Sequence, residues 1–210
     1  MKTLKIIAAL ATAVSLSACA SVETVSRSAP TTAPSVQPAS AQLNIQAVQI
    51  AVPYSLTVSE ANRYYPGSDI VWREDPLGDR HQQVKAIFEA GLQKASAQTQ
   101  GSVPVLVDIE VSRFHALTEK ARYTTGGVHS LQFTMRLLNP ETGVAYTEPR
   151  EIKADFKAFG GARAINAERN GITQKVRITD RIAEVVAQEL ANPGSFVALN
   201  NGFYGALNQL

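Results

Sequence analysis

The sequence predicts an α+β fold: an antiparallel four-stranded sheet with two helices packed on one face, in the order β-α-β-β-β-α. Four stretches alternate apolar with polar residues, which is typical of strands with one buried side. Two other stretches repeat apolar residues every three or four positions, which is typical of amphipathic helices. One antiparallel sheet covered by both helices is the simplest way to bury all of these apolar surfaces.

The first predicted strand covers residues 43–52. Its apolar positions slip by one residue between Ile45 and Val48, and a β-bulge accounts for the slip. The alternating residues are Leu43, Ile45, Val48, Ile50 and Val52. Residues 59–78 contain aromatic side chains without periodicity, which indicates a long loop.

The first predicted helix begins at Asp79, which can cap the first turn while Gln82 completes a capping box. Its apolar face carries Val84, Ile87, Phe88, Leu92 and Ala95, and Gly101 closes the segment. The second helix is predicted over residues 173–191, with Pro193-Gly194 as the stop. Its apolar side carries Val176, Ile182, Val185, Val186 and Leu190.

Three more strands are predicted between the helices. Residues 105–111 and 131–137 alternate regularly, and His115 to Val128 between them forms a long hairpin or loop. Residues 139–143, Asn-Pro-Glu-Thr-Gly, form a turn. The last strand places Ile152, Ala154, Phe156 and Ala158 inward and Lys153, Asp155 and Lys157 outward, and Gly160-Gly161 ends it. We therefore expect one domain over residues 43–194, and a tail over 195–210 that either docks or frays.

Residues 1–18 have the pattern of an export signal, in which Lys2 and Lys5 precede an apolar run, Ile6 to Val14, that is too short to span a membrane permanently. Leu16-Ser17-Ala18-Cys19 resembles the lipobox of bacterial lipoproteins, whose cysteine receives a diacylglyceryl group before cleavage. The resemblance implies membrane attachment through lipid on Cys19. Ala20 stands where an aspartate typically causes retention at the inner membrane, so the resemblance also implies the outer membrane, facing the periplasm.

Residues 19–42 are rich in Ser, Thr, Ala and Pro and lack apolar periodicity, so they predict a flexible tether after the lipidated cysteine. A coil of this length spans roughly 25–30 Å on average. Without Lys2 and Lys5 the chain holds 18 basic and 18 acidic residues, which argues against a nucleic-acid partner. Cys19 is the single cysteine, so the domain has no disulfide.

Few residue patterns suggest chemistry. The three histidines, His81, His115 and His129, match no metal-binding spacing, and surface or strand-end positions are the simpler interpretation. Asp108 and Glu110 share a strand face, where a solvent-exposed pair is the usual outcome. No nucleophile motif and no phosphate-binding loop occurs, so we expect no enzyme, cofactor or metal site.

Arginine and aromatic residues gather in two predicted loop regions, and these residue types anchor protein interfaces. They provide candidate partner-binding residues or, alternatively, packing against the sheet. The candidates are Trp72, Arg73, Arg113, Phe114, His115, Arg122 and Tyr123.

The segments Val71–Asp75 (VWRED), Arg113–Thr118 (RFHALT) and Tyr123–His129 (YTTGGVH) resemble those of a small group of uncharacterised lipoproteins, found mainly in marine alphaproteobacteria. The resemblance covers most of the chain after the tether and implies no known activity. In plan alone, the tethered domain is also similar to envelope accessory lipoproteins that serve transport or assembly machines.

These observations favour a non-enzymatic, lipid-anchored module that binds another envelope component, with a protein as the expected partner. One alternative is an envelope hydrolase acting on cell wall or lipid, with a site among His115, His129 and Asp155. The other alternative is a passive structural lipoprotein.

Overall fold

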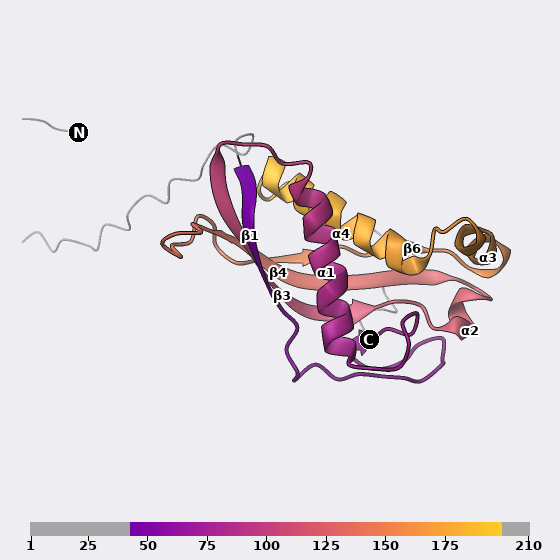
Figure 1. Ribbon diagram of the computed structural model, residues 1–210. Helices are drawn as coiled ribbons and strands as arrows, with labels where there is room; N and C mark the ends of the chain where they lie inside the picture. The colour runs from indigo at the N-terminus through magenta and orange to yellow at the C-terminus, as the bar shows by residue number, and fades with distance from the viewer. Residues whose placement is uncertain (1–42, 199–210) are drawn as a thin grey trace, which may run out of the picture. The chain divides into compact units, whose positions relative to one another are not determined.

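A six-stranded mixed sheet is the framework of residues 43–198, which are the residues that the computed structural model describes (Figure 1). The predictions for residues 1–42, including Cys19 and the tether, and for residues 199–210 lie outside this range. The strands are β1 (Leu43–Ala51), β2 (Ile70–Val71), β3 (Val103–His115), β4 (Gly127–Leu138), β5 (Arg150–Lys153) and β6 (Phe156–Ala158). The helices are α1 (Arg80–Ser96), α2 (Glu119–Arg122), α3 (Gly161–Arg169) and α4 (Gln174–Ala191).

The strand order is β1-β3-β4-β5, with β2 also paired to β3 and β6 also paired to β4. β1 and β2 run parallel to β3, whereas the pairs that involve β4 are antiparallel. The prediction of a purely antiparallel, four-stranded sheet is therefore wrong. The physical reason is that α1 lies between β1 and β3 in the chain, and such a crossover returns the chain to the end where the first strand began.

The predicted bulge in the first strand is confirmed, because the register of β1 against β3 shifts between Ile45 and Ala47. The predicted last strand is divided into β5 and β6. Asp155, at the break, accepts hydrogen bonds from the backbone N–H of Leu131 at 2.9 Å and from the Ser130 hydroxyl at 3.2 Å. Its carboxylate thus replaces a backbone contact that a continuous strand would have made.

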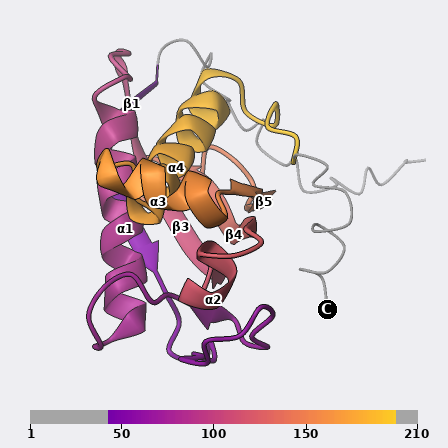
Figure 2. The same cartoon turned by 90° about the vertical axis from the view of Figure 1, so that its right-hand side faces the viewer.

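α1 and α4 lie side by side over one face of the sheet, as predicted (Figures 1 and 2). Phe88 of α1 packs edge-on against Phe133 of β4, with ring centroids 5.3 Å apart. The helices approach closely at Gly91, where a Cβ atom would lie 2.7 Å from Cγ2 of Ile182. We call the opposite side of the sheet the open face.

Both predicted helix starts are confirmed. Asp79 accepts a hydrogen bond from the backbone N–H of Gln82 at 3.1 Å, and Thr173 caps α4 through the N–H of Val176. The reciprocal half of the capping box is absent, because the Gln82 side chain donates to the Tyr54 hydroxyl instead.

α2 and α3 are additions to the predicted elements. α2 interrupts the connection between β3 and β4, and α3 follows β6 directly. The backbone of Gly160-Gly161, before α3, lies against the backbone of Gly126-Gly127, after α2. The contact is so close that a Cβ atom on Gly160 would lie 2.2 Å from the backbone nitrogen of Gly126. These glycines therefore permit contact between two segments as well as turns.

The core lies between the sheet and the two long helices, and most residues predicted to face inward are buried there. Val52 is only partly buried, and Val48 and Val176 have 42% and 37% of their surfaces exposed. The core also continues past the predicted domain end at residue 194. Phe196 is buried, and its N–H donates to Glu189 at 2.8 Å, so the first residues of the predicted tail dock on the domain.

Candidate functional site

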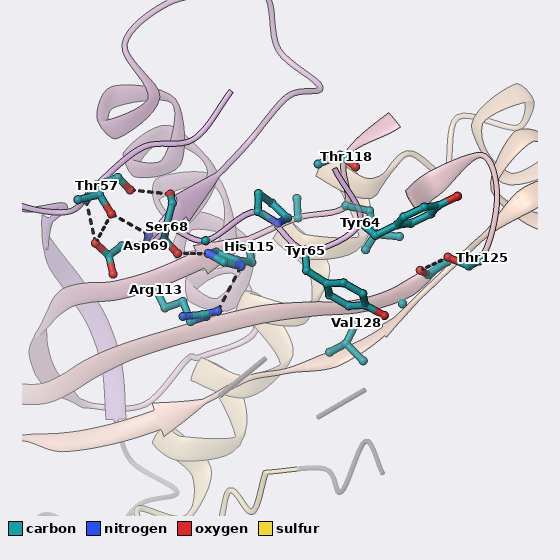
Figure 3. A pocket seen from close by; sticks show the side chains of 16 residues that line it. Thr57, Tyr64, Tyr65, Ser68, Asp69, Arg113, His115, Thr118, Thr125 and Val128 are labelled. Atoms are coloured by element: carbon teal, nitrogen blue, oxygen red, sulfur yellow. Dashed lines mark hydrogen bonds between the residues drawn. The ribbon is translucent and has the colours of Figure 1, made fainter. Parts of the chain in front are cut away.

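A cavity of about 700 Å³ opens where β3 ends and β4 begins (Figure 3). Residues 64–69, in the loop before β2, form one wall. Residues 115–118 and 125–128, at the end of β3, the start of β4 and in the connection between them, form the other wall. Ligand-binding pockets commonly have volumes of about 300–1,000 Å³, so this cavity has the size of a binding site. We call it the β3–β4 pocket.

Arg113 and His115 line the pocket from the open face of β3. Nη2 of Arg113 lies 3.3 Å from Nδ1 of His115, and Nε2 of His115 contacts the carbonyl oxygen of Ser68 (Figure 3). Because a guanidinium can only donate, Nδ1 accepts and Nε2–H donates to the carbonyl. Burial, followed by the charge of Arg113, lowers the pKa of His115 to about 4, which keeps the ring neutral. His115 thereby orients the guanidinium.

Arg113 forms no ion pair within 4.0 Å among residues 43–198, although its side chain is partly buried. Burial lowers its pKa, whereas the longer-range charges of Asp155 and Asp69 favour the cation. Asp69 also lines the pocket, where one of its oxygens accepts from the Thr57 N–H at 2.8 Å and the Thr57 hydroxyl at 2.7 Å. These bonds lower the pKa of Asp69. The pocket therefore offers both a donor and an acceptor of charge-assisted hydrogen bonds.

Two tyrosines stand at the pocket wall. Tyr64 and Tyr65 are 41% and 61% exposed, and the amino group of Lys120 lies 4.8 Å from the Tyr64 ring centroid. The same loop is attached to the opposite wall, because the Thr118 hydroxyl donates to the carbonyl oxygen of Arg63 at 2.8 Å. Exposed aromatic rings beside a cavity are suited to contact with a ligand.

Two of the predicted partner-binding residues belong to the core. Trp72 and Phe114 are fully buried, with their rings 5.7 Å apart in an edge-on arrangement. The indole N–H of Trp72 donates to Asp75 at 2.8 Å. For these two residues the structure supports the packing alternative, and neither presents a surface to a partner.

Three other candidates participate in ion pairs and hydrogen bonds that connect α2 with α3 and with the segment after β2. Arg73 pairs with Glu119 at 2.6 Å. Arg122 is buried and pairs with Glu74 at 3.0 Å and with Glu168 at 3.2 Å, while its Nη2 donates to the hydroxyl of Tyr123. Tyr123 remains 43% exposed. Only Arg113 and His115 of the seven candidates line the pocket, and a partner contact at the exposed part of Tyr123 stays a prediction.

The three residues of the hydrolase alternative do not lie on one side of the sheet. His115 pairs with Ser130 across the open face, and Asp155 accepts a hydrogen bond from Ser130 on that side. His129, the next residue along β4, points to the helix face, where its ring lies 4.9 Å from that of Phe156. The sheet therefore separates His129 from the other two residues.

His81 lies apart from the other histidines, on α1, with Nε2 at 3.1 Å from the carbonyl oxygen of Leu56. Within the described part of the chain, no group of three or more His, Cys, Asp or Glu residues could hold a metal ion. Asp108 pairs with Arg136 at 2.6 Å across the open face, and Glu110 is exposed. No helix between residues 43 and 198 is long and apolar enough to cross a membrane.

Sequence reasoning missed several pocket residues. Ser68, Asp69 and Tyr65 lie in the loop before β2, which the sequence marks only by its aromatic content. Gly126 and Gly127, which the sequence places in a long hairpin or loop, also line the cavity. The strand register brings these segments together, and no local pattern reports it.

Residues 43–206 match the model of a family of unknown function, DUF6778. The chain belongs to this family. Membership confirms the expected place in an uncharacterised family, while an alphaproteobacterial origin stays a prediction. No curated protein matches the chain.

Several solved structures are similar to the family member described here. Protein XCC0632 from Xanthomonas campestris, of family DUF330, is 13% identical over 71% of this chain and 83% of its own, with a TM-score of 0.38. A proposed lipoprotein from Caulobacter crescentus is 13% identical over 72% and 93%, with a TM-score of 0.30. A PelC dodecamer from Paraburkholderia phytofirmans is 15% identical over 72% and 87%, with a TM-score of 0.31. Because every TM-score is below 0.5, these likenesses support no functional inference.

Proposed function

We propose that this DUF6778 protein is a lipoprotein anchored in the outer membrane through Cys19, and that its periplasmic domain is a non-enzymatic module that binds an envelope protein. The lipobox-like segment before Cys19 supports the anchor. The β3–β4 pocket supports the binding role, and we expect it to bind a segment of the partner's polypeptide chain.

The observation that supports the binding role is that a cation, Arg113, and an anion, Asp69, line one large cavity without pairing with each other. Arg113 lacks an ion pair in the described residues, and Asp69 shares the same lining. A polypeptide segment offers carbonyl acceptors and N–H donors at every residue, so it can satisfy both groups. Tyr64 and Tyr65 add apolar contact area beside them.

The anchor is tested by labelling cells with a radioactive fatty acid. The wild-type chain should take up label, and Cys19→Ser should not. A Cys19→Ser protein that still takes up label would end the anchor proposal. Separating inner from outer membranes by density then tests the location, and label recovered with the inner membrane would contradict it.

The binding role is tested by photo-crosslinking in cells. A photoreactive residue in place of Tyr65 should produce a discrete crosslinked species that contains an envelope protein, identified by mass spectrometry. The matched control replaces Val144, which is 63% exposed at the opposite end of β4. Equal crosslinking at both positions, or adducts with lipid alone at residue 65, would refute the binding role and favour the passive structural alternative.

A further inference from the structure

Two arginines share one aromatic ring where β6 meets α3 and α4. The central guanidinium carbon of Arg163 lies 4.0 Å from the ring centroid of Phe159, and that of Arg177 lies 3.5 Å from the same centroid. Two planar groups this near the centroid cannot share one face, so the ring lies between them. The distance between their central carbons cannot exceed the sum of these two distances, which is below the Debye length of roughly 8 Å at physiological salt. The two positive charges therefore repel each other with little screening.

The acidic residues of α3 and α4 do not compensate these charges. Asp180 pairs with Lys94 at 2.6 Å, Glu184 with Arg181 at 2.8 Å, and Glu168 with Arg122 at 3.2 Å. Glu189, the remaining acidic residue of the two helices, pairs with Arg150. In the part of the chain described by the structure, neither Arg163 nor Arg177 has a carboxylate within 4.0 Å.

The two guanidinium groups differ in how firmly they are held. Nη2 of Arg177 donates to the carbonyl oxygen of Lys157 at 2.8 Å, and burial together with Arg163 lowers the pKa of Arg177. Arg163 is exposed and makes no hydrogen bond within residues 43–198. Stacking on Phe159 stabilises each cation, but it does not cancel the repulsion between them. The site therefore has unsatisfied positive charge and free N–H donors.

We infer that Arg163 and Arg177, held on the two faces of Phe159, bind the phosphate group of a ligand. A phosphate presents several acceptor oxygens and accepts bidentate, charge-assisted bonds of about 2.7–2.9 Å from guanidinium groups. An anion beside the ring would neutralise both cations at once. This site is separate from the β3–β4 pocket and does not depend on the function proposed for it.

Two sources could supply the phosphate: the headgroup of an anionic phospholipid, or a soluble phosphate ester. The experiment uses the full chain carrying Cys19→Ser, so that no lipid anchor contributes. One arm follows the arginine Nε–H signals by NMR during titration with inorganic phosphate, at constant ionic strength maintained with chloride. The other arm measures co-sedimentation with vesicles of phosphatidylcholine alone and of phosphatidylcholine with one-fifth phosphatidylglycerol.

The signals of Arg163 and Arg177 should shift in a saturable manner. Arg163→Gln should weaken phosphate binding by about tenfold or more, because one charge-assisted contact is lost. Arg163 is exposed and outside the core, so this variant keeps the fold even if Arg177→Gln does not. The matched control is Arg169→Gln, which removes an exposed arginine from the same helix and should change binding less than twofold.

Preference for the phosphatidylglycerol vesicles, lost in Arg163→Gln, would identify a lipid headgroup as the source. Saturable phosphate binding without that preference would identify a soluble ester. Two results would overturn the inference. The first is the absence of saturable shifts together with the absence of vesicle preference. The second is equal weakening by Arg163→Gln and Arg169→Gln, which would indicate nonspecific charge attraction.

Discussion

Acid should destabilise this fold through His129 at a pH where few carboxyl groups titrate. The side chain is 1% exposed, and burial together with the charges of Arg177 and Arg122 lowers its pKa to about 3. In the unfolded chain its pKa is about 6.5. Between these two values the unfolded chain binds a proton that the folded chain excludes. The free energy of unfolding therefore falls as the pH is lowered from 6.5.

The size of the effect follows from the two pKa values. Between pH 7 and pH 5 the linkage relation gives a loss of about 2 kcal/mol for His129. His115, with a folded pKa of about 4, contributes about the same loss, so the sum is about 4 kcal/mol. The carboxyl group of Asp69, whose pKa is lowered, titrates below this range. Asp155, whose pKa burial raises, binds its proton more readily when folded and opposes part of the loss.

Urea unfolding at pH 7 and pH 5, at one ionic strength, measures this difference. The wild-type chain should lose about 4 kcal/mol, and His129→Leu should lose about half as much. His115→Gln is the matched variant on the opposite face of the sheet and should also halve the loss. Comparing each variant with itself at two pH values removes any change in packing. If His129→Leu lost as much stability as the wild type, the assignment of the acid sensitivity to this histidine would be refuted.

Two further predictions concern packing. Gly160→Ala should lower the free energy of unfolding by at least about 3 kcal/mol, because its Cβ would lie 2.2 Å from the backbone nitrogen of Gly126. Gly67→Ala, with nothing within 4 Å, should cost less than about 0.5 kcal/mol in the same urea unfolding assay at pH 7, and equal losses for the two variants would contradict the reasoning. Glu189→Gln should cost about 3 kcal/mol, because this buried carboxylate accepts from an arginine and from two backbone N–H groups. Asp180→Asn, which breaks an exposed ion pair, should cost less than about 1 kcal/mol. A loss equal to that of Glu189→Gln would show that burial of the Glu189 carboxylate adds nothing to its contribution.

The elements that the sequence predicts correctly are those with local signals. Alternation over residues 105–111 predicts part of β3, and Asp79 marks the start of α1, because each pattern depends only on neighbours in the chain. The slip after Ile45 even predicts the bulge in β1. α3 lacks such a signal: it is shorter than either predicted helix and buries a single residue, Ala164, so no extended apolar face marks it.

The properties that sequence reasoning missed depend on contacts between distant segments. The direction of β1 follows from its pairing with β3, which no pattern within either strand reports. The candidate site shows the same limit. Arg113 and Phe114 are adjacent and composition predicts the same role for both, yet alternation along β3 places one in the pocket and the other in the core. Asp69 joins Arg113 only through the pairing of β2 with β3.

The neutral form of His115 connects the pocket to the stability of the fold. Protonation of Nδ1 would remove the acceptor that holds Arg113 and would place two cations 3.3 Å apart. A pKa of about 4 keeps this form rare above pH 5, so the guanidinium stays oriented throughout that range. The free energy of unfolding already falls at higher pH, because below about pH 6.5 the unfolded chain binds a proton that folded His115 excludes. As the pH is lowered, loss of stability therefore precedes loss of the binding geometry. A bound ligand that does not itself titrate should consequently stabilise the domain equally at pH 6 and pH 8.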